Sequence, residues 1–396
     1  MYKVLTILTL ILLCNFADAD LNQSSSCTTN SPWNQNQLTV ADGGNDTIDE
    51  SFRPFDFAID SQHNIYVTDS DHKRILMYPN NYTIGQMPTI VVSNVTCEAL
   101  CLDHYDNLYF VDLNSIKILN RTTGNVTLFA DSYYSTSFNA YRPIGFPSDL
   151  YIDTNSRLYA LESGARVIRF LLEQPSNSTL VISRGTDLNV FKCIFIDETD
   201  NNAIYICTSP PTSKIVKFTN DGSNWTMIVD DKTLAGNSST NISMYFDSLI
   251  VDSLNQQLYI LDGINNRVIQ WSLLNKTQPG QIIIQLSNTT SPNRIRLDKE
   301  KNLYVSLIDD NNNGRIIKFI NCNPNQTTIM STSTTMSTST ITATTTMIYT
   351  SLTTITSTTT IANSTSNAVM NSIVRNNVTS IFLSIIMILN SLYFTI

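Results

Sequence analysis

Hydrophobic and polar positions repeat with a long period through the middle of the chain. An aliphatic residue followed by aspartate occurs six times, at intervals of 43 to 55 residues. These aspartates are Asp60, Asp103, Asp153, Asp197, Asp252 and Asp298. An aliphatic-tyrosine pair places its tyrosine six to eight residues after each of them. The spacing predicts one structural unit that recurs six times.

Each unit contains a third apolar segment, which in five of the six begins with Arg or Lys and ends in an aromatic residue. Fourth segments follow in five units, at residues 89–92, 126–129, 179–183, 226–229 and 282–286. Short β-branched and aromatic runs bounded by Asn, Asp, Gly or Ser are typical of strands joined by turns. Four antiparallel strands per unit predict an all-β fold, a six-bladed β-propeller.

The sixth unit has no fourth segment, because the chain reaches Cys322 soon after Phe319. Residues 38–41 form an apolar run before the first unit and belong to no unit. We expect this N-terminal run to pair beside Ile317 as the outer strand of the last blade. Such pairing closes the ring and covers an exposed sheet edge.

The repeat resembles the NHL repeat over about residues 37–320. The best matches are residues 53–78, 146–170 and 246–271. The pattern departs from the family at Phe55, Ser115, Ser148 and Thr208. The resemblance implies a six-bladed propeller of the extracellular, non-enzymatic type.

The N-terminus is typical of a secretory signal peptide. Lys3 precedes an apolar stretch, and Ala17-Asp18-Ala19 has the small residues of a cleavage site. Cleavage after Ala19 would remove Cys14 and leave six of the seven cysteines in an oxidising compartment.

The C-terminus is typical of a lipid-anchor signal. Residues 380–396 are mostly apolar, and a Ser/Thr-rich stretch precedes them. We expect a glycosylphosphatidylinositol (GPI) anchor at Ser366, with Asn363 or Ser364 as other attachment points and a short transmembrane helix as the alternative. The expected parts are listed in chain order: signal peptide (1–19), N-terminal segment (20–36), NHL-type propeller (37–322), stalk (323–366) and hydrophobic anchor signal (367–396).

Composition supports an extracellular location. The chain has 33 acidic and 24 basic residues and a net charge of −9, which argues against nucleic-acid binding through phosphates. Asn-x-Ser/Thr sequons outside the anchor signal predict N-glycosylation. They lie at Asn22, Asn45, Asn81, Asn94, Asn120, Asn125, Asn177, Asn224, Asn237, Asn241, Asn275, Asn288, Asn325 and Asn363.

The six cysteines suggest three disulfides. Cys193 and Cys207 flank the first hairpin of the fourth unit, and antiparallel register would place them opposite each other. Cys27 and Cys322 flank the two strands that close the ring. Cys97 and Cys101 would form the third pair, which requires a tight turn between them. Six cysteines allow fifteen connectivities, so the pairing is a hypothesis.

Candidate chemistry in the repeat is sparse. The repeated aspartates could form a metal or catalytic ring, but their common position predicts that they cap turns. The three histidines, His63, His72 and His104, come from two neighbouring units and are expected at the surface, away from the axis. Asp149 and Asp247 lie at strand entries, where they could face the central channel and hold calcium.

These observations predict a cell-surface glycoprotein on the extracellular side of the plasma membrane. We expect its propeller to bind an extracellular protein or glycan ligand, without a cofactor and without catalysis. The alternative is a metal-dependent hydrolase or lyase acting at the central channel. Such an enzyme would resemble lactonase-like propellers, which use calcium, or peptidyl-amidoglycolate lyases, which use a metal with histidines. A purely structural coat protein is a third hypothesis.

Overall fold

The computed structural model describes residues 31–43, 52–135, 139–162, 166–183, 190–208, 213–235 and 244–322. Within these ranges no helix is long and apolar enough to cross a bilayer. The predicted signal peptide, stalk and anchor signal, Ser366 included, lie outside the described residues.

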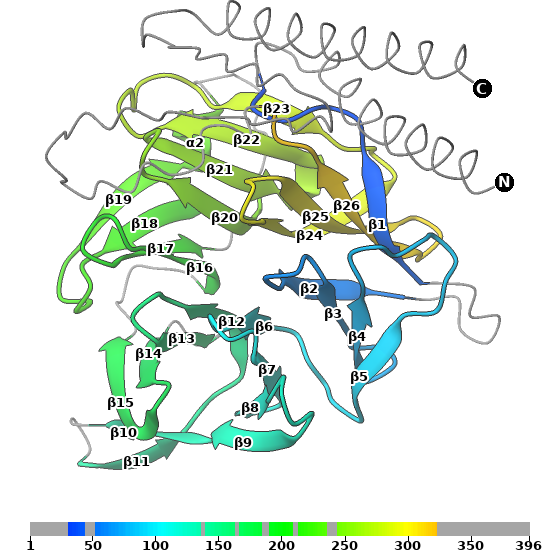
Figure 1. The fold of residues 1–396 in the computed structure, drawn as a ribbon. Coiled ribbons are helices and arrows are strands. Elements are labelled where there is room, and N and C mark those ends of the chain that lie inside the picture. Colours follow the sequence, from blue (N-terminus) through cyan, green and yellow to red (C-terminus); the bar gives the residue numbers. More distant parts are fainter. Residues whose placement is uncertain are drawn as a thin grey trace, which may run out of the picture. The chain divides into compact units, whose positions relative to one another are not determined.

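Six four-stranded antiparallel sheets surround a common centre and form a six-bladed β-propeller, as the repeat predicts (Figure 1). The first strand of each blade is innermost and contacts the first strands of both neighbouring blades. These strands are β2 (Pro54–Ile59), β6 (Leu100–Leu102), β12 (Pro147–Ile152), β16 (Phe191–Asp197), β20 (Phe246–Asp252) and β24 (Thr290–Leu297).

The remaining strands follow in order toward the rim. The second strands are β3 (Ile65–Asp69), β7 (Leu108–Asp112), β13 (Arg157–Glu162), β17 (Ala203–Thr208), β21 (Gln257–Asp262) and β25 (Leu303–Asp309). The third strands are β4 (Arg74–Tyr78), β8 (Ser115–Leu119), β14 (Arg166–Leu171), β18 (Lys214–Phe218), β22 (Arg267–Ser272) and β26 (Gly314–Phe319). The outer strands are β5 (Thr89–Ser93), β9 (Val126–Ala130), β15 (Gln174–Ile182), β19 (Trp225–Asp230) and β23 (Gln281–Gln285).

The second strands are buried on both faces because each blade packs between two others. In β17 every residue is buried, and Tyr205 packs with Trp271 of the next blade. A single sheet could not bury both faces alone, so each core cluster spans neighbouring blades.

The N-terminal strand closes the ring as expected. β1 (Leu38–Asp42) pairs antiparallel with β26, and Thr39 lies opposite Ile317. Upstream, Trp33 is buried, and its indole Nε1 donates a hydrogen bond to the Lys301 carbonyl over 2.8 Å. The last blade therefore contains strands from both ends of the described chain.

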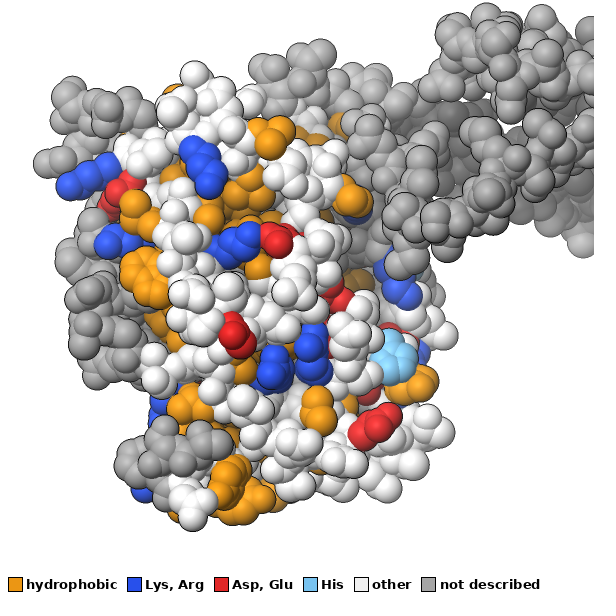
Figure 2. All heavy atoms as spheres, turned by 90° about the vertical axis from the view of Figure 1, so that its left-hand side faces the viewer, with side chains coloured by type: hydrophobic (Ala, Val, Ile, Leu, Met, Phe, Trp, Pro, Cys, Tyr) orange, Lys and Arg blue, Asp and Glu red, His pale blue; other side chains and the backbone are white. Residues whose placement is uncertain are grey.

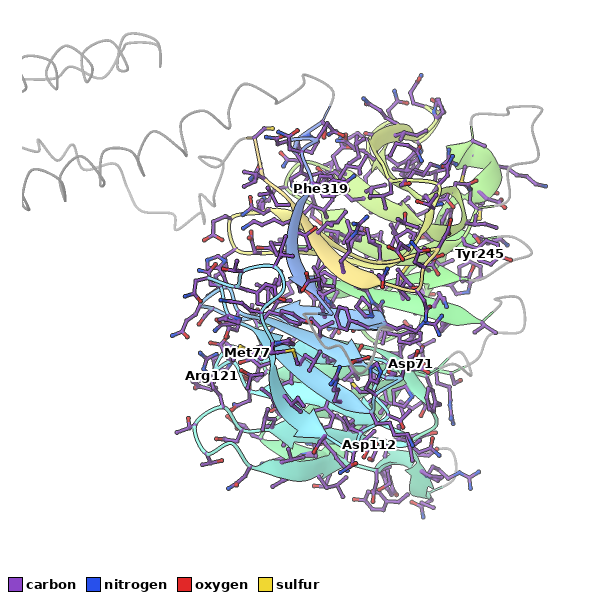
Figure 3. All side chains as sticks on the ribbon, turned by 90° about the vertical axis from the view of Figure 1, so that its right-hand side faces the viewer. Asp71, Met77, Asp112, Arg121, Tyr245 and Phe319 are labelled. Carbon is purple, nitrogen blue, oxygen red and sulfur yellow. A yellow bond between two sulfur atoms is a disulfide. The ribbon has the colours of Figure 1, made fainter. Side chains whose placement is uncertain are left out.

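The turns lie on two faces of the ring. Turns after the first and third strands of a blade lie on one face, which we call the aspartate face because it carries the six repeated aspartates. Turns after the second strand and between blades lie on the opposite face. In the edge-on view of Figure 3, Arg121 lies on the aspartate side, and Asp71, Asp112 and Tyr245 lie on the other.

Several elements depart from the plain repeat. A two-stranded hairpin, β10 (Ser132–Ser135) and β11 (Ala140–Pro143), is inserted between the second and third blades. The Tyr134 amide donates to Ser178 Oγ over 3.1 Å and holds the hairpin beside β15. Short helices α2 (Asp231–Leu234) and η2 (Gly263–Asn265) were not predicted either. Hydrophobic and charged side chains are interspersed on the rim shown in Figure 2.

One predicted disulfide is confirmed. Cys193 on β16 is bonded to Cys207 on β17, with 5.1 Å between their Cα atoms, and the two residues are direct register partners. Cys322 is also disulfide-bonded, whereas its predicted partner Cys27 lies outside the described residues.

The predicted Cys97–Cys101 disulfide is wrong, because both residues are free thiols. Cys97 packs in the cluster that includes Tyr66 of the first blade, whereas Cys101 packs in the cluster that includes Leu150 of the third. The two thiols therefore lie on opposite faces of the second blade, and the tight turn that pairing requires does not form.

Peptide mapping under non-reducing conditions should recover Cys193 joined to Cys207 and should recover Cys97 and Cys101 as thiols. Burial raises the pKa of both thiols, so iodoacetamide should modify them only after unfolding. A peptide in which Cys97 is joined to Cys101 would contradict this structure.

Candidate functional site

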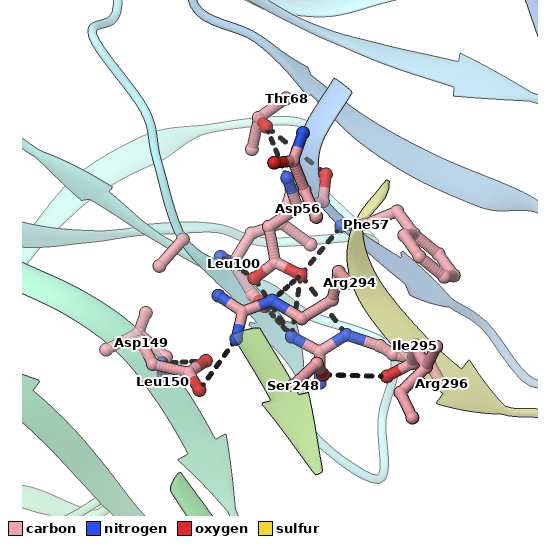
Figure 4. A network of polar contacts seen from close by, with 12 residues as sticks. Asp56, Phe57, Thr68, Leu100, Asp149, Leu150, Ser248, Arg294, Ile295 and Arg296 are labelled. Atoms are coloured by element: carbon pink, nitrogen blue, oxygen red, sulfur yellow. Dashed lines mark hydrogen bonds and ion pairs between the residues drawn. The ribbon is translucent and has the colours of Figure 1, made fainter. Parts of the chain in front are cut away.

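The blades share one register position near the axis, four residues before each repeated aspartate. Its occupants are Asp56, Ala99, Asp149, Cys193, Ser248 and Arg294. Three of these side chains, from blades one, three and six, converge at the centre of the ring (Figure 4). They form the principal charged cluster at the axis of the described chain.

Asp56 is the most heavily bonded member of this cluster. Arg296 Nη2 donates to both of its carboxylate oxygens, over 2.8 and 2.9 Å, and Arg294 Nε lies 3.2 Å from Oδ1. The amides of Phe57 and Leu100 also donate to this carboxylate. Its acceptor capacity is therefore used by the protein itself.

Asp149 is held in a similar way. Its Oδ2 accepts hydrogen bonds from Arg294 Nη1 and from the Ile194 amide, each over 2.9 Å, and its Oδ1 accepts from the Leu150 amide. Burial raises the pKa of Asp149, and Arg294 opposes that rise. Arg294 thus joins Asp56 and Asp149 from two different blades.

These contacts form links between blades. Asp56 binds the Leu100 amide of the second blade, and Asp149 binds the Ile194 amide of the fourth. Ser248 Oγ donates to the Ile295 carbonyl of the sixth blade over 3.4 Å. The shared register position therefore bonds each of these blades to the next blade around the axis.

Asp247, next to Ser248, lies close to this cluster. Burial raises its pKa from the usual 3.8 to about 6, although Lys192 Nζ lies 3.9 Å away and Arg294 also favours the charged form. The nearby Gly263 amide also favours the charged form. Asp247 is thus a carboxylate that the fold holds at an energetic cost.

The oxygen atoms present here do not fit the calcium site that the positions of Asp149 and Asp247 suggested. A calcium ion requires six to eight oxygen ligands with free lone pairs. The Asp149 oxygens already accept three hydrogen bonds, and a guanidinium lies where a cation would bind. A metal could bind at Asp149 only if Arg294 were displaced.

A cavity of about 320 Å³ extends from this cluster toward the aspartate face. Asp149, Arg294 and Arg296 line its inner end, and Asp252 and Lys301 line the end near the turns. The remaining wall is mostly apolar, with Tyr151, Ile194, Phe195, Ser248, Leu249, Ile250, Val251, Ile295 and Leu297. It is the described cavity closest to the axis.

The repeated aspartates cap turns, as predicted. Asp60 Oδ1 accepts hydrogen bonds from the amides of Gln62 and Asn64, over 2.8 Å each, and Asp103 has equivalent partners. Asp60 also binds Arg121 of the next blade over 2.7 Å. Because they lie in separate turns, these aspartates do not form a single ring-shaped site.

A second set of acids binds basic residues on the opposite face. Asp69 pairs with Arg74, and Asp262 pairs with Arg267, each over 2.8 Å. Both carboxylates are fully buried, so loss of either pair should cost more than loss of a surface pair. In the second blade Lys117 pairs with Asp112 over 2.6 Å, although Ser115 occupies the usual basic position.

The histidines do not converge on the axis. His72 contacts Asp69 over 2.8 Å, and His104 stacks on Tyr105.

His63 lies near Asp298 and Glu300, and the three could supply metal ligands. Asp298, however, already accepts hydrogen bonds from Asn302 and Tyr304, and Lys318 Nζ lies 3.6 Å away. We therefore interpret this cluster as a polar contact between blades six and one. His63 and His72 are half-buried rather than at the surface.

Eight of the predicted glycosylation sites lie in the described part. Seven of these asparagines are exposed, and Asn120 is half-buried because its side chain caps a turn. The exposed ones are Asn81, Asn94, Asn125, Asn177, Asn224, Asn275 and Asn288. Outside the described residues lie Asn22, Asn45, Asn237, Asn241, Asn325 and Asn363.

Sequence reasoning identified Asp149 and Asp247 but missed Asp56, Arg294 and Arg296. An alignment of the repeats would have placed Asp56, Asp149 and Arg294 in one column. Two acids and one base in the same column, at a position near the axis, would have indicated an ion-pair cluster. The contact between blades six and one, which brings Arg294 to Asp56, was not visible in the sequence.

No family model matches the chain, and no curated protein matches it significantly. Among solved structures, a gluconolactonase from Xanthomonas campestris matches with a TM-score of 0.53 and 12% identity, over 73% of this chain and 91% of that one. A Bacteroides thetaiotaomicron protein of unknown function matches with a TM-score of 0.52 and 14% identity, over 72% of this chain and 76% of that one. These likenesses show the six-bladed propeller fold alone, and NHL membership stays a prediction.

The raised pKa of Asp247 predicts a pH-dependent effect of Asp247→Asn. The folded protein binds a proton at this residue more tightly than the unfolded chain does, so wild-type stability should fall as pH rises from about 4 to about 6. At pH 7 the variant should therefore be more stable, by about 2–3 kcal/mol, and the gain should vanish near pH 4.

Denaturant unfolding at several pH values measures this difference. Asp310→Asn, at an exposed turn position, is the matched control and should change stability little at any pH. A constant difference between Asp247→Asn and wild type across this pH range would contradict the prediction.

Proposed function

We propose that this protein is a secreted, glycosylated propeller held at the cell surface, which binds an extracellular protein or glycan ligand. The observation that carries the proposal is the position of Arg294. Its guanidinium binds the carboxylates that a metal-dependent propeller enzyme would need free at the axis. Binding without metal catalysis is therefore the function that the described centre supports best.

The aspartate face offers the more apolar loops for a partner. The four most exposed large hydrophobic residues of the described chain all lie in its turns. They are Leu274, Tyr105, Leu254 and Ile84, with exposed fractions of 79%, 70%, 67% and 63%. Exposed apolar and aromatic side chains surrounded by polar groups are typical of protein-binding surfaces.

The proposed location at the cell surface rests on the sequence. The apolar N-terminus, the sequons and the hydrophobic C-terminus together favour export, glycosylation and a lipid anchor. Exposure of seven described sequon asparagines is compatible with glycan attachment. The confirmed Cys193–Cys207 disulfide supports folding in an oxidising compartment.

The rival hypothesis is metal-dependent hydrolysis or elimination at the channel. Elemental analysis of the purified glycoprotein should find no stoichiometric divalent ion. A chelator should leave its melting temperature unchanged, because Arg294 already neutralises the axial carboxylates. One tightly bound calcium or zinc per chain, lost together with activity after Asp149→Asn, would favour the enzyme instead.

Substitutions in the exposed loops test the binding surface. Tyr105→Ala and Leu254→Ser should each weaken capture of an extracellular partner about tenfold or more, since exposed aromatic and aliphatic anchors contribute most of such affinities. Ile264→Ser is the matched control, because Ile264 is 55% exposed on the opposite face. Equal capture by all three variants would contradict the proposed surface.

A further inference from the structure

We propose that the axial cavity binds a small organic anion, a carboxylate attached to an apolar body. This inference concerns the cavity, not the loops proposed to bind a macromolecule, and it stands without them. It rests on which polar groups in the cavity wall have partners within the protein.

The acceptors that line the cavity are occupied. Asp149 is bound by Arg294 and two backbone amides. Asp252, near the mouth, accepts hydrogen bonds from the amide and the side chain of Asn255, over 3.3 and 2.8 Å. A ligand that needs strong acceptors would find few that are free.

Three donors that line the cavity have no such partners. Arg296 uses Nε and Nη2 for Asp56 and the Leu100 carbonyl, whereas its Nη1 has no partner in the described chain. The Lys301 ammonium and the Tyr151 hydroxyl also make no hydrogen bond or ion pair with the described residues. Burial raises the pKa of Tyr151, so the hydroxyl keeps its proton and can donate.

The Arg296 guanidinium and the Tyr151 ring are held in place, and Lys301 is held at its backbone. Asp56 holds the Arg296 guanidinium through two oxygens. The buried Trp33 fixes the turn of Lys301 through the carbonyl of that residue. Tyr151 stacks edge-on against Phe195, with 5.4 Å between ring centroids. Fixed donors reduce the conformational entropy that the protein loses when a ligand binds.

The unpaired donors and the lining together define the ligand class. Arg294, Arg296 and Lys301 face the lining acids Asp149 and Asp252, and Asp56 behind the arginines balances the third base. The preference for an anion therefore comes from the unpaired donors rather than from net charge. The wall between the donors is apolar, and about 320 Å³ is enough space for a small ring or a short chain. Apolar pockets with a few convergent polar groups are typical small-molecule sites.

Isothermal titration of the purified glycoprotein tests this assignment with 3-phenylpropionate as the probe. The neutral 3-phenylpropionamide has nearly the same shape, and acetate has the charge without the apolar body. We expect 3-phenylpropionate to bind at least about tenfold more tightly than either, because charge-assisted hydrogen bonds and apolar burial both contribute. High salt should weaken its binding.

Two lysine variants distinguish this cavity from general surface attraction. Lys301→Met should weaken binding of 3-phenylpropionate about tenfold, whereas Lys299→Met, at an exposed position two residues away and outside the cavity wall, should leave it unchanged. Tyr151→Phe should weaken it less, because one neutral donor is lost.

Three results would overturn the proposal. They are equal affinity for the acid and its amide, equal effects of the two lysine substitutions, and no binding of the acid at all. Because Tyr105 and Leu254 are not part of the cavity wall, Tyr105→Ala and Leu254→Ser should leave titration with 3-phenylpropionate unchanged. The experiments therefore distinguish failure of the proposal for the loop surface from failure of the proposal for the cavity.

Discussion

The centre of this propeller depends on one guanidinium shared by two carboxylates. Arg294 of the sixth blade binds Asp56 of the first and Asp149 of the third, and its own side chain is only 8% exposed. Burying these charges is costly, so the arrangement is stable only while every partner is present. Loss of one partner should cost about 3–5 kcal/mol, since an uncompensated charge would remain inside. The polar cluster therefore links blades that are not neighbours in the ring.

The same interaction limits the chemistry available at the axis. Carboxylates that could ligate a metal are bound to arginines and backbone amides, so the channel retains unpaired donors rather than free acceptors. The fold is shared with a gluconolactonase, but a shared fold does not transfer activity. In this chain, the chemistry of the centre depends on the residue type at one register position of each blade.

The repeat made the fold predictable because a blade leaves a periodic pattern in the sequence. The pairing of Thr39 with Ile317 followed from counting strands, and the Cys193–Cys207 disulfide followed from hairpin register. The Cys97–Cys101 prediction failed because pairing by elimination ignored which neighbouring blade each side chain faces. The axial cluster was only partly predictable, since contacts between blades depend on the closed ring and not on local pattern.

A double-mutant cycle between Arg294 and Asp149 measures the central interaction most directly. Arg294→Met removes the guanidinium and Asp149→Asn removes the negative charge, and the free energies of unfolding of the two variants and the double variant can be compared with wild type. We predict that the double variant loses clearly less stability than the sum of the two, with a coupling energy of about 1.5 kcal/mol or more. Additivity within about 0.5 kcal/mol would contradict the account.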